Sequence, residues 1–154
     1  MRRFLCLLLV LTVTAARAET RVVDGDTLRV DGVVMRLWGI DAPERRQTCS
    51  NDAGDYACGE RAASHLLALV TGHSVACKAR NRDRYGRTIA ACRSDDRDLG
   101  SAMVSAGWAL AYVRYSADYL DEEKAARNAR RGLWAGSFMA PWDWRTVRRR
   151  AAAP

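Results

Sequence analysis

An Asp-Gly pair in the middle of residues 27–37 is the feature that most limits how this chain can fold. Polar and apolar side chains alternate before the pair, and an apolar stretch returns after it. Alternation is typical of a strand with one buried face, and Asp-Gly between two such stretches is a strong signal for a two-residue hairpin. In that hairpin Thr27 faces Arg36, which leaves Asp26 about one residue from Arg36. We therefore predict that charges distant in the sequence meet at one end of a hairpin.

Residues 1–18 are typical of an export signal rather than of a folded segment. Arg2 and Arg3 give a positive start, residues 4–13 are almost entirely apolar, and a small-x-small cleavage site ends at Ala18. An N-terminal membrane anchor is the alternative, but the apolar run is short for a bilayer span, which needs about 20 residues. We expect cleavage after Ala18 and a mature chain that is exported, to the periplasm or the medium, without a membrane segment.

Length and charge limit the class of protein. The formal net charge is +7, and it becomes +4 without residues 1–18, because that segment holds three arginines and no acidic residue. A mildly basic chain suits a polyanionic partner without identifying one. The remaining length is enough for one domain with its own core. We place this domain at residues 19–146 and expect a basic, frayed tail at residues 147–154.

Four cysteines lie beyond the export signal: Cys49, Cys58, Cys77 and Cys92. An even number of cysteines in an exported chain predicts two disulfides. A zinc site is the alternative, but the chain has no Cys-x-x-Cys pair. Three pairings are possible, and a symmetric hairpin that turns at Arg84-Tyr85 would put Cys77 opposite Cys92. That arrangement favours Cys77–Cys92 and Cys49–Cys58, unless a bulge shifts the register.

Helical patterns follow the first strands. Apolar residues recur at helical spacing in residues 60–70, and Asp98 is a potential N-cap for a short helix that ends near residue 106. Residues 119–131 carry acidic side chains at the start and arginines at the end, which complements a helix dipole. Strands first, a helix between them and helices at the end are typical of an α+β fold.

Three short stretches carry side chains suited to attack on a phosphodiester. They are Asp-Gly-Asp-Thr at residues 24–27, Arg-Leu-Trp-Gly-Ile-Asp-Ala-Pro-Glu at residues 36–44 and Asp-Arg-Tyr-Gly-Arg at residues 83–87. Carboxylate oxygens bind hard cations such as calcium, and a further Glu can activate water. Arginine forks match phosphate oxygens in a bidentate manner.

In order and in sequence these stretches resemble the staphylococcal nuclease (thermonuclease) family, from about Arg21 to about Trp134. The resemblance implies a five-stranded OB-fold β-barrel with three helices, a frequent platform for nucleic acids. It also implies a calcium ion held by the carboxylates of Asp26 and Asp41 and by the main-chain carbonyl of Ala42. The family often has Thr at position 42, but a main-chain ligand tolerates this difference.

The resemblance assigns the other site residues as well. Glu44 would act as general base on a water near the metal, or would position that water. Arg36 and Arg87 would hold the scissile phosphate, whose charge grows in the transition state. The substrate-binding residues would be Arg84, Tyr85, Tyr112 and Tyr115, with Tyr85 lining the nucleotide pocket.

The function implied is that of an exported, monomeric, calcium-dependent nuclease that hydrolyses DNA, with RNA as a further candidate substrate, with little sequence specificity. The first alternative is a non-catalytic OB-fold module that binds nucleic acid. Loss of the Glu or of an arginine would mark such a module, and all three are present in this chain. A phosphatase for small phosphoesters is the second alternative.

Overall fold

The computed structural model describes residues 19–152. Residues 1–18, where the export signal is predicted, lie outside the described residues. Within residues 19–152, no helix combines the length and the apolar character needed to cross a bilayer.

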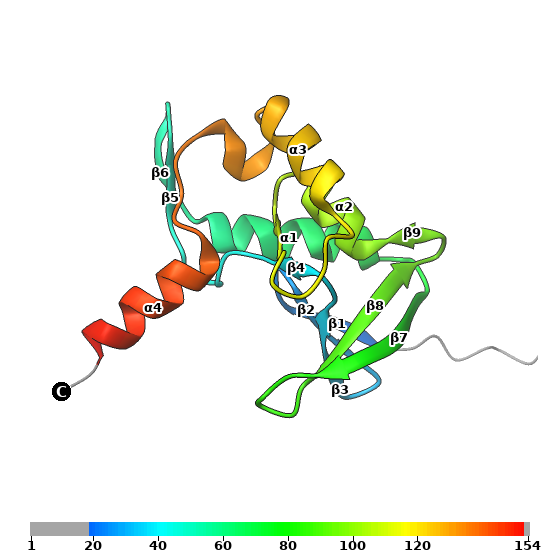
Figure 1. Ribbon diagram of the computed structural model, residues 1–154. Coiled ribbons are helices and arrows are strands. Elements are labelled where there is room, and N and C mark those ends of the chain that lie inside the picture. The colour runs from blue at the N-terminus through cyan, green and yellow to red at the C-terminus, as the bar shows by residue number, and fades with distance from the viewer. Residues whose placement is uncertain (1–18, 153–154) are drawn as a thin grey trace, which may run out of the picture.

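The main sheet is mixed and curls into a half-barrel (Figure 1), which confirms the predicted α+β, OB-like class. Its strand order is β1-β2-β3-β8-β7, and β9 pairs with the far part of β8. All neighbours are antiparallel except β3 and β8, which run parallel. The strands are β1 (Thr20–Asp24), β2 (Thr27–Val30), β3 (Val33–Leu37), β7 (Val75–Arg82), β8 (Thr88–Ser94) and β9 (Arg97–Asp98).

The hairpin of β2 and β3 has the predicted register, with Thr27 opposite Arg36. Asp31 and Gly32 both have positive φ, 48° and 81°, which is the backbone that the favoured two-residue hairpin turns require. The N–H of Leu37 donates to the carbonyl of Asp26 at 2.7 Å. The hairpin thus fixes the start of β2 beside the end of β3, where the first acidic stretch lies.

The hairpin of β7 and β8 confirms the predicted disulfide. Cys77 pairs directly with Cys92, and the second disulfide joins Cys49 to Cys58. The turn differs from the symmetric one expected: Arg82 pairs with Thr88, which centres the hairpin on Tyr85. A bulge between Ala79 and Asn81 then shifts the register by one residue and brings Cys77 opposite Cys92.

Replacing Cys77 and Cys92 together with alanine should lower the free energy of unfolding by about 3 kcal/mol, because the bond closes a loop of 15 residues. Denaturant titration of the variant and of the oxidised wild type measures the difference. As a control, the wild type and the variant are both measured under reducing conditions, where Cys49–Cys58 is open in both proteins and the difference between them should largely disappear. Non-reducing peptide mapping that joined Cys49 to Cys77 would contradict the pairing itself.

Four α-helices occur in the described residues, one more than expected. The helices are α1 (Cys58–Val70), α2 (Leu99–Ser105), α3 (Leu120–Asn128), the short 3₁₀ helix η1 (Gly132–Ala135) and α4 (Pro141–Ala151). The Asp98 side chain accepts from the N–H of Ser101, as expected for the N-cap of α2. Helix α4 includes residues 147–151, so this part of the expected frayed tail is helical. Pro141 occupies its first turn and arginines its last, both favourable positions.

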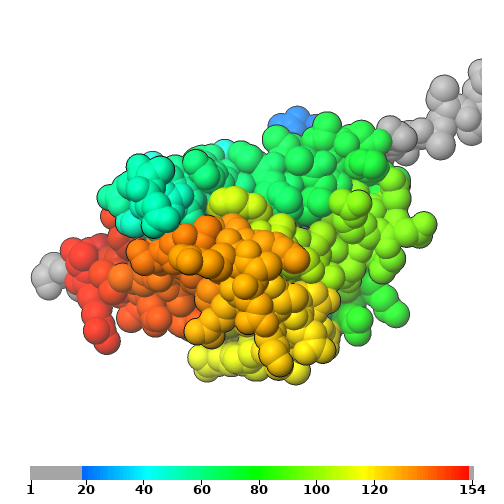
Figure 2. All heavy atoms as spheres, turned by 90° about the horizontal axis from the view of Figure 1, so that it is seen from above, coloured from blue at the N-terminus to red at the C-terminus, as the bar shows by residue number. Residues whose placement is uncertain are grey.

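Two hydrophobic clusters position these elements. The larger lies between the half-barrel, α1 and α2. The smaller surrounds the Cys49–Cys58 disulfide with Leu110 and Leu133, and Trp134 and Trp142 pack against it. It connects three segments: the pair β4 (Ile40–Asp41) and β10 (Leu110–Ala111), the pair β5 (Cys49–Asn51) and β6 (Gly54–Tyr56), and η1 with the start of α4. Figure 2 shows the orange segment of α3 and η1 beside the cyan β5–β6 segment, with α4 in red at the same end.

Candidate active site

A cleft of about 580 Å³ opens where β3, the β7–β8 turn, the β10–α3 loop and α4 meet. Its lining contains six arginines (Arg36, Arg84, Arg87, Arg114, Arg145 and Arg149) and three carboxylates (Asp24, Glu44 and Asp83). The excess of guanidinium groups gives the wall a positive potential, which favours an anionic ligand.

Arg36 lines the cleft, and behind it lie the two predicted metal ligands, which do not themselves line the cleft. We call this group of Asp26, Asp41 and Arg36 the floor. Asp26 and Asp41 are 2% and 0% exposed. Nη2 of Arg36 lies 2.7 Å from Oδ2 of Asp26 and 2.5 Å from Oδ1 of Asp41, so both carboxylates converge on one point. The register of β2 against β3 places Asp26 next to Arg36, and pairing of β4 with β10 places Asp41 beneath them. The N–H of Ala42 donates to Oδ2 of Asp26 at 3.1 Å.

These buried carboxylates perturb one another. Burial raises the pKa of Asp24 to about 7, and the charge of Asp26 acts in the same direction. Burial also opposes ionisation of Asp26, but the guanidinium of Arg36 and the hydrogen bonds that Asp26 makes together outweigh it and lower the pKa of Asp26. Burial and the charge of Asp26 raise the pKa of Asp41, against the opposing hydrogen bonds of Arg145. The carboxylates of Asp24 and Asp41 are therefore repelled by the charge of Asp26, and an additional cation at the floor would reduce this repulsion.

The donor set on this floor fits a hard cation. Two carboxylates converge on Nη2 of Arg36, whose place a bound cation would take, and Ala42, the expected carbonyl ligand, is buried directly beside them. Within residues 19–152, no three His, Cys, Asp or Glu side chains are grouped as a metal site. Side chains would thus supply two ligands, and carbonyl, water and substrate oxygens the rest. Calcium accepts such a mixed, flexible shell more readily than magnesium does.

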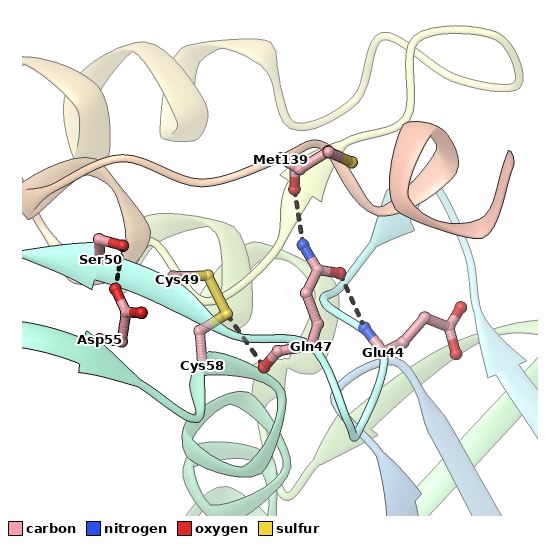
Figure 3. Close-up of a disulfide and its surroundings, with 7 residues drawn as sticks. All are labelled: Glu44, Gln47, Cys49, Ser50, Asp55, Cys58 and Met139. Carbon is pink, nitrogen blue, oxygen red and sulfur yellow. Dashed lines mark hydrogen bonds between the residues drawn. A yellow bond between two sulfur atoms is a disulfide. The ribbon is translucent and has the colours of Figure 1, made fainter. Parts of the chain in front are cut away.

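Glu44 borders the floor on a turn held by Gln47, which is fully buried. The Gln47 side chain accepts from the N–H of Glu44 at 3.3 Å and donates to the carbonyl of Met139 at 2.6 Å (Figure 3). The start of α1 presses against the same turn, since a Cβ on Gly59 would lie 1.9 Å from the Glu44 carbonyl oxygen. The adjacent Cys58 is bonded to Cys49. Gln47 therefore connects the Glu44 turn to the chain that leads into α4.

Arg145 is the site residue that sequence reasoning missed. From α4, its Nη1 lies 3.0 Å from Oδ1 of Asp41 and 2.8 Å from Oε1 of Glu44, and its Nη2 lies 2.7 Å from Oδ2 of Asp41. These hydrogen bonds outweigh the cost of burial and raise the pKa of Arg145. In the sequence it is one of four arginines in residues 141–150, and only the contact with Asp41, 104 positions away, distinguishes it.

The β7–β8 turn presents Tyr85 and Arg87 on a carboxylate scaffold. Oδ1 of Asp83 accepts from the N–H groups of Tyr85 and Arg87, each at 2.9 Å, and Oδ2 accepts from Nε of Arg87 at 2.6 Å. Partial burial opposes ionisation of Asp83, but these hydrogen bonds outweigh it and lower its pKa. Gly86 has a φ of 78°, which closes the turn. The Asp-x-Tyr-Gly-Arg motif therefore fixes the orientation of the Arg87 side chain through local hydrogen bonds to Asp83.

The four predicted substrate-binding residues all line the cleft. Tyr85 and Tyr115 are 67% and 58% exposed, and the guanidinium of Arg84 lies 4.9 Å from the centre of the Tyr85 ring. Tyr112 is less free, because it stacks on Trp142 of α4 with ring centres 5.6 Å apart. The rings of Tyr85 and Tyr115 are therefore exposed in the cleft, whereas the ring of Tyr112 packs against α4.

Residues 49–58, the loop closed by the Cys49–Cys58 disulfide, do not line the cleft. They form the β5–β6 hairpin at the opposite side of the smaller hydrophobic cluster (Figure 1). The disulfide lies next to the Glu44 turn, because Sγ of Cys58 is 3.4 Å from the carbonyl oxygen of Gln47. Neither cysteine lines the cleft.

Comparison with known proteins shows to which family the chain belongs. The family model described as "Staphylococcal nuclease homologue" matches residues 34–136. An "Uncharacterized endonuclease" of Escherichia coli O157:H7 is 36% identical over 133 residues, 81% of this chain and 81% of the relative. A "Micrococcal nuclease" of Shigella flexneri is 32% identical over 149 residues, 85% of this chain and 80% of the relative.

A third relative has a different kind of name. The "Succinoglycan biosynthesis protein ExoI" of Rhizobium meliloti is 33% identical over 120 residues, which cover 75% of this chain and 63% of that protein. The family match includes Arg36, Asp41, Glu44 and Arg87, whereas Asp26 and Arg145 lie outside it. With the match covering most of the chain, the protein belongs to the staphylococcal nuclease homologue family.

Proposed function

We propose that the protein is an exported, monomeric, calcium-dependent nuclease that hydrolyses phosphodiester bonds of DNA, with RNA as a further candidate substrate, with little sequence preference. One observation carries the proposal: in a cleft lined by six arginines and Glu44, Arg36 contacts two buried carboxylates that lie directly behind the lining. Positive walls suit the sugar–phosphate backbone, and the acidic floor suits a cation. The aromatic rings along the wall suit bases of any identity.

The two family arginines keep N–H groups for substrate. Arg36 uses Nη2 for the floor, and Arg87 uses Nε for Asp83, while their other guanidinium N–H groups have no partner among residues 19–152. Donors fixed before substrate arrives act most strongly on charge that develops in the transition state. We assign both to the non-bridging oxygens of the scissile phosphate. Calcium, when held by Asp26, Asp41 and the Ala42 carbonyl, would supply charge neutralisation and orient water.

Glu44 has one carboxylate oxygen for proton transfer. Oε1 accepts from Arg145, whereas Oε2 has no partner among the described residues, and the side chain is 31% exposed at the cleft wall. A base placed in this way accepts a proton from an attacking water while Arg145 fixes its orientation.

Tyr85 and Tyr115 would stack on bases, a contact worth roughly 1–3 kcal/mol for each base and tolerant of sequence.

Export is supported by the disulfides. Both Cys49–Cys58 and Cys77–Cys92 form within the described residues, and such bonds persist in oxidising compartments. We therefore propose that the protein acts in the periplasm or outside the cell.

Incubating the purified mature protein with plasmid DNA and with total RNA, in calcium or in chelator, tests the proposal. We expect calcium to support degradation of the polymers, magnesium to replace it poorly and chelator to abolish the activity. A protein that retains DNA in a mobility-shift assay but never cleaves it would instead be the non-catalytic binding module. Activity confined to mononucleotide esters would support a phosphatase.

A further inference from the structure

Helix α4 is built as a wall of the cleft. Pro141 is buried, Trp142 stacks on Tyr112, and Gln47 holds the carbonyl of Met139 just before the helix begins. Arg145 then joins α4 to the buried Asp41. The three contacts come from three different segments of the chain, and together with the burial of Pro141 they hold the helix in place. The helix lies outside residues 34–136, so the family match does not assign it a role.

Arg149 lies on the same side of α4 as Arg145. It lies four positions after Arg145, so the two side chains are neighbours on the helix surface, with Cβ atoms roughly 5–6 Å apart. Both line the cleft. Their partners differ: Arg145 is bound to Asp41 and Glu44, whereas Arg149 donates only to the Thr146 hydroxyl, at 3.2 Å. Within residues 19–152, Arg149 makes no ion pair with a carboxylate.

Arg149 is exposed, so its guanidinium is accessible to an anion that enters the cleft. The β7–β8 turn, which carries Arg84 and Arg87, forms one wall, and α4 forms another wall of the same cleft (Figure 1). A phosphate held at the floor by Arg36 and Arg87 would therefore have its neighbour in the strand within reach of α4. The guanidinium group is suited to hold the oxygens of such a phosphate in bidentate geometry.

We propose that α4 forms an additional phosphate-binding subsite, in which Arg149 binds the phosphate that neighbours the scissile one in a polynucleotide strand. The inference rests on the proposed nuclease function and assigns Arg149 a contact beyond the scissile phosphate, one that strands with at least two phosphates can make and diesters of a single nucleotide cannot. Arg145 lies between the subsite and the floor, and it keeps α4 in place through Asp41.

Arg148 provides a matched control. It is the adjacent residue on the same helix and has the same charge, but it does not line the cleft, and its guanidinium lies over the ring of Trp144 at 5.3 Å. Arg149→Ala and Arg148→Ala therefore remove equal charge from α4 and differ in whether the lost group faces the cleft. Arg149→Lys retains the positive charge but removes the planar guanidinium group that can bind a phosphate in bidentate geometry.

The test compares two substrates: a short single-stranded oligodeoxynucleotide and a nitrophenyl diester of a single nucleotide. Arg149→Ala should lower kcat/KM for the oligonucleotide about tenfold, the effect of losing one charge-assisted hydrogen bond, and leave the mononucleotide diester unchanged. Arg148→Ala should leave kcat/KM unchanged for both substrates. An equal loss on both substrates, or no loss on the oligonucleotide, would overturn the subsite.

Binding in chelator tests the subsite without requiring catalysis. Fluorescence anisotropy with the oligonucleotide should show that Arg149→Ala reduces the slope of log K against log salt by about 0.7, as expected for one phosphate contact with a single strand. Arg149→Lys should retain the slope. A reduced slope in a protein that cleaves neither substrate would support the subsite and refute the nuclease proposal, whereas an unchanged slope would refute the subsite even if the wild type is an active nuclease.

Discussion

Glu44→Gln should lower turnover on plasmid DNA by roughly 10²–10⁴-fold, the range that a positioned general base contributes. The amide keeps the shape of the side chain and an acceptor oxygen for Nη1 of Arg145, so the turn held by Gln47 should stay in place. What is lost is the ability to take a proton at the second oxygen. A continuous plasmid-degradation assay in saturating calcium measures the change.

Calcium binding separates the role of Glu44 from that of the floor. In calorimetric titrations Glu44→Gln should bind calcium nearly as well as the wild type, whereas Asp41→Ala should bind it much more weakly. A loss of turnover below about tenfold would show that Glu44 positions the water without taking its proton, since a glutamine can also hold a water. Full activity in chelator would falsify the calcium mechanism altogether.

The elements that sequence reasoning predicted well are those with local signals. Asp31-Gly32 selects one turn type, and that turn fixes the register that brings Asp26 to Arg36. The Cys77–Cys92 pairing was predicted correctly although the turn is centred on Tyr85 and not between Arg84 and Tyr85, because the bulge between Ala79 and Asn81 moves the register by the one residue that compensates. The Asp-x-Tyr-Gly-Arg stretch also folds on itself, through hydrogen bonds that span four residues or fewer.

Helix α4 has no comparable local signal. Its residues are rich in arginine and carry only a few apolar side chains, a pattern that also describes a solvated tail. The helix is held by contacts that cross most of the chain, from Gln47 to Met139 and from Arg145 to Asp41. Pattern analysis of one segment does not detect a partner about a hundred positions away, so Arg145 was missed together with the helix that carries it.

Arg87→Ala should lower kcat by roughly 10²–10³-fold, the effect of removing a fixed donor to a developing negative charge. Binding of uncleaved DNA in chelator should change little, because the proposed contact strengthens mainly in the transition state. The free energy of unfolding should also change little. The lost ion pair with Asp83 is partly exposed, and such pairs contribute about 0–1 kcal/mol.

Arg36→Ala is the informative comparison, because the same loss of a phosphate donor comes with a second effect. Arg36 is only 15% exposed and balances two buried carboxylates, Asp26 and Asp41. Removing one partner of a buried ion pair typically destabilises a protein by about 3–5 kcal/mol. Denaturant titration should therefore distinguish the variants even though both lose turnover: Arg36→Ala unfolds at lower denaturant concentration, and Arg87→Ala does not. If Arg87→Ala retained the kcat of the wild type, its assignment to the scissile phosphate would be wrong, and Asp83 would hold it for a structural purpose only.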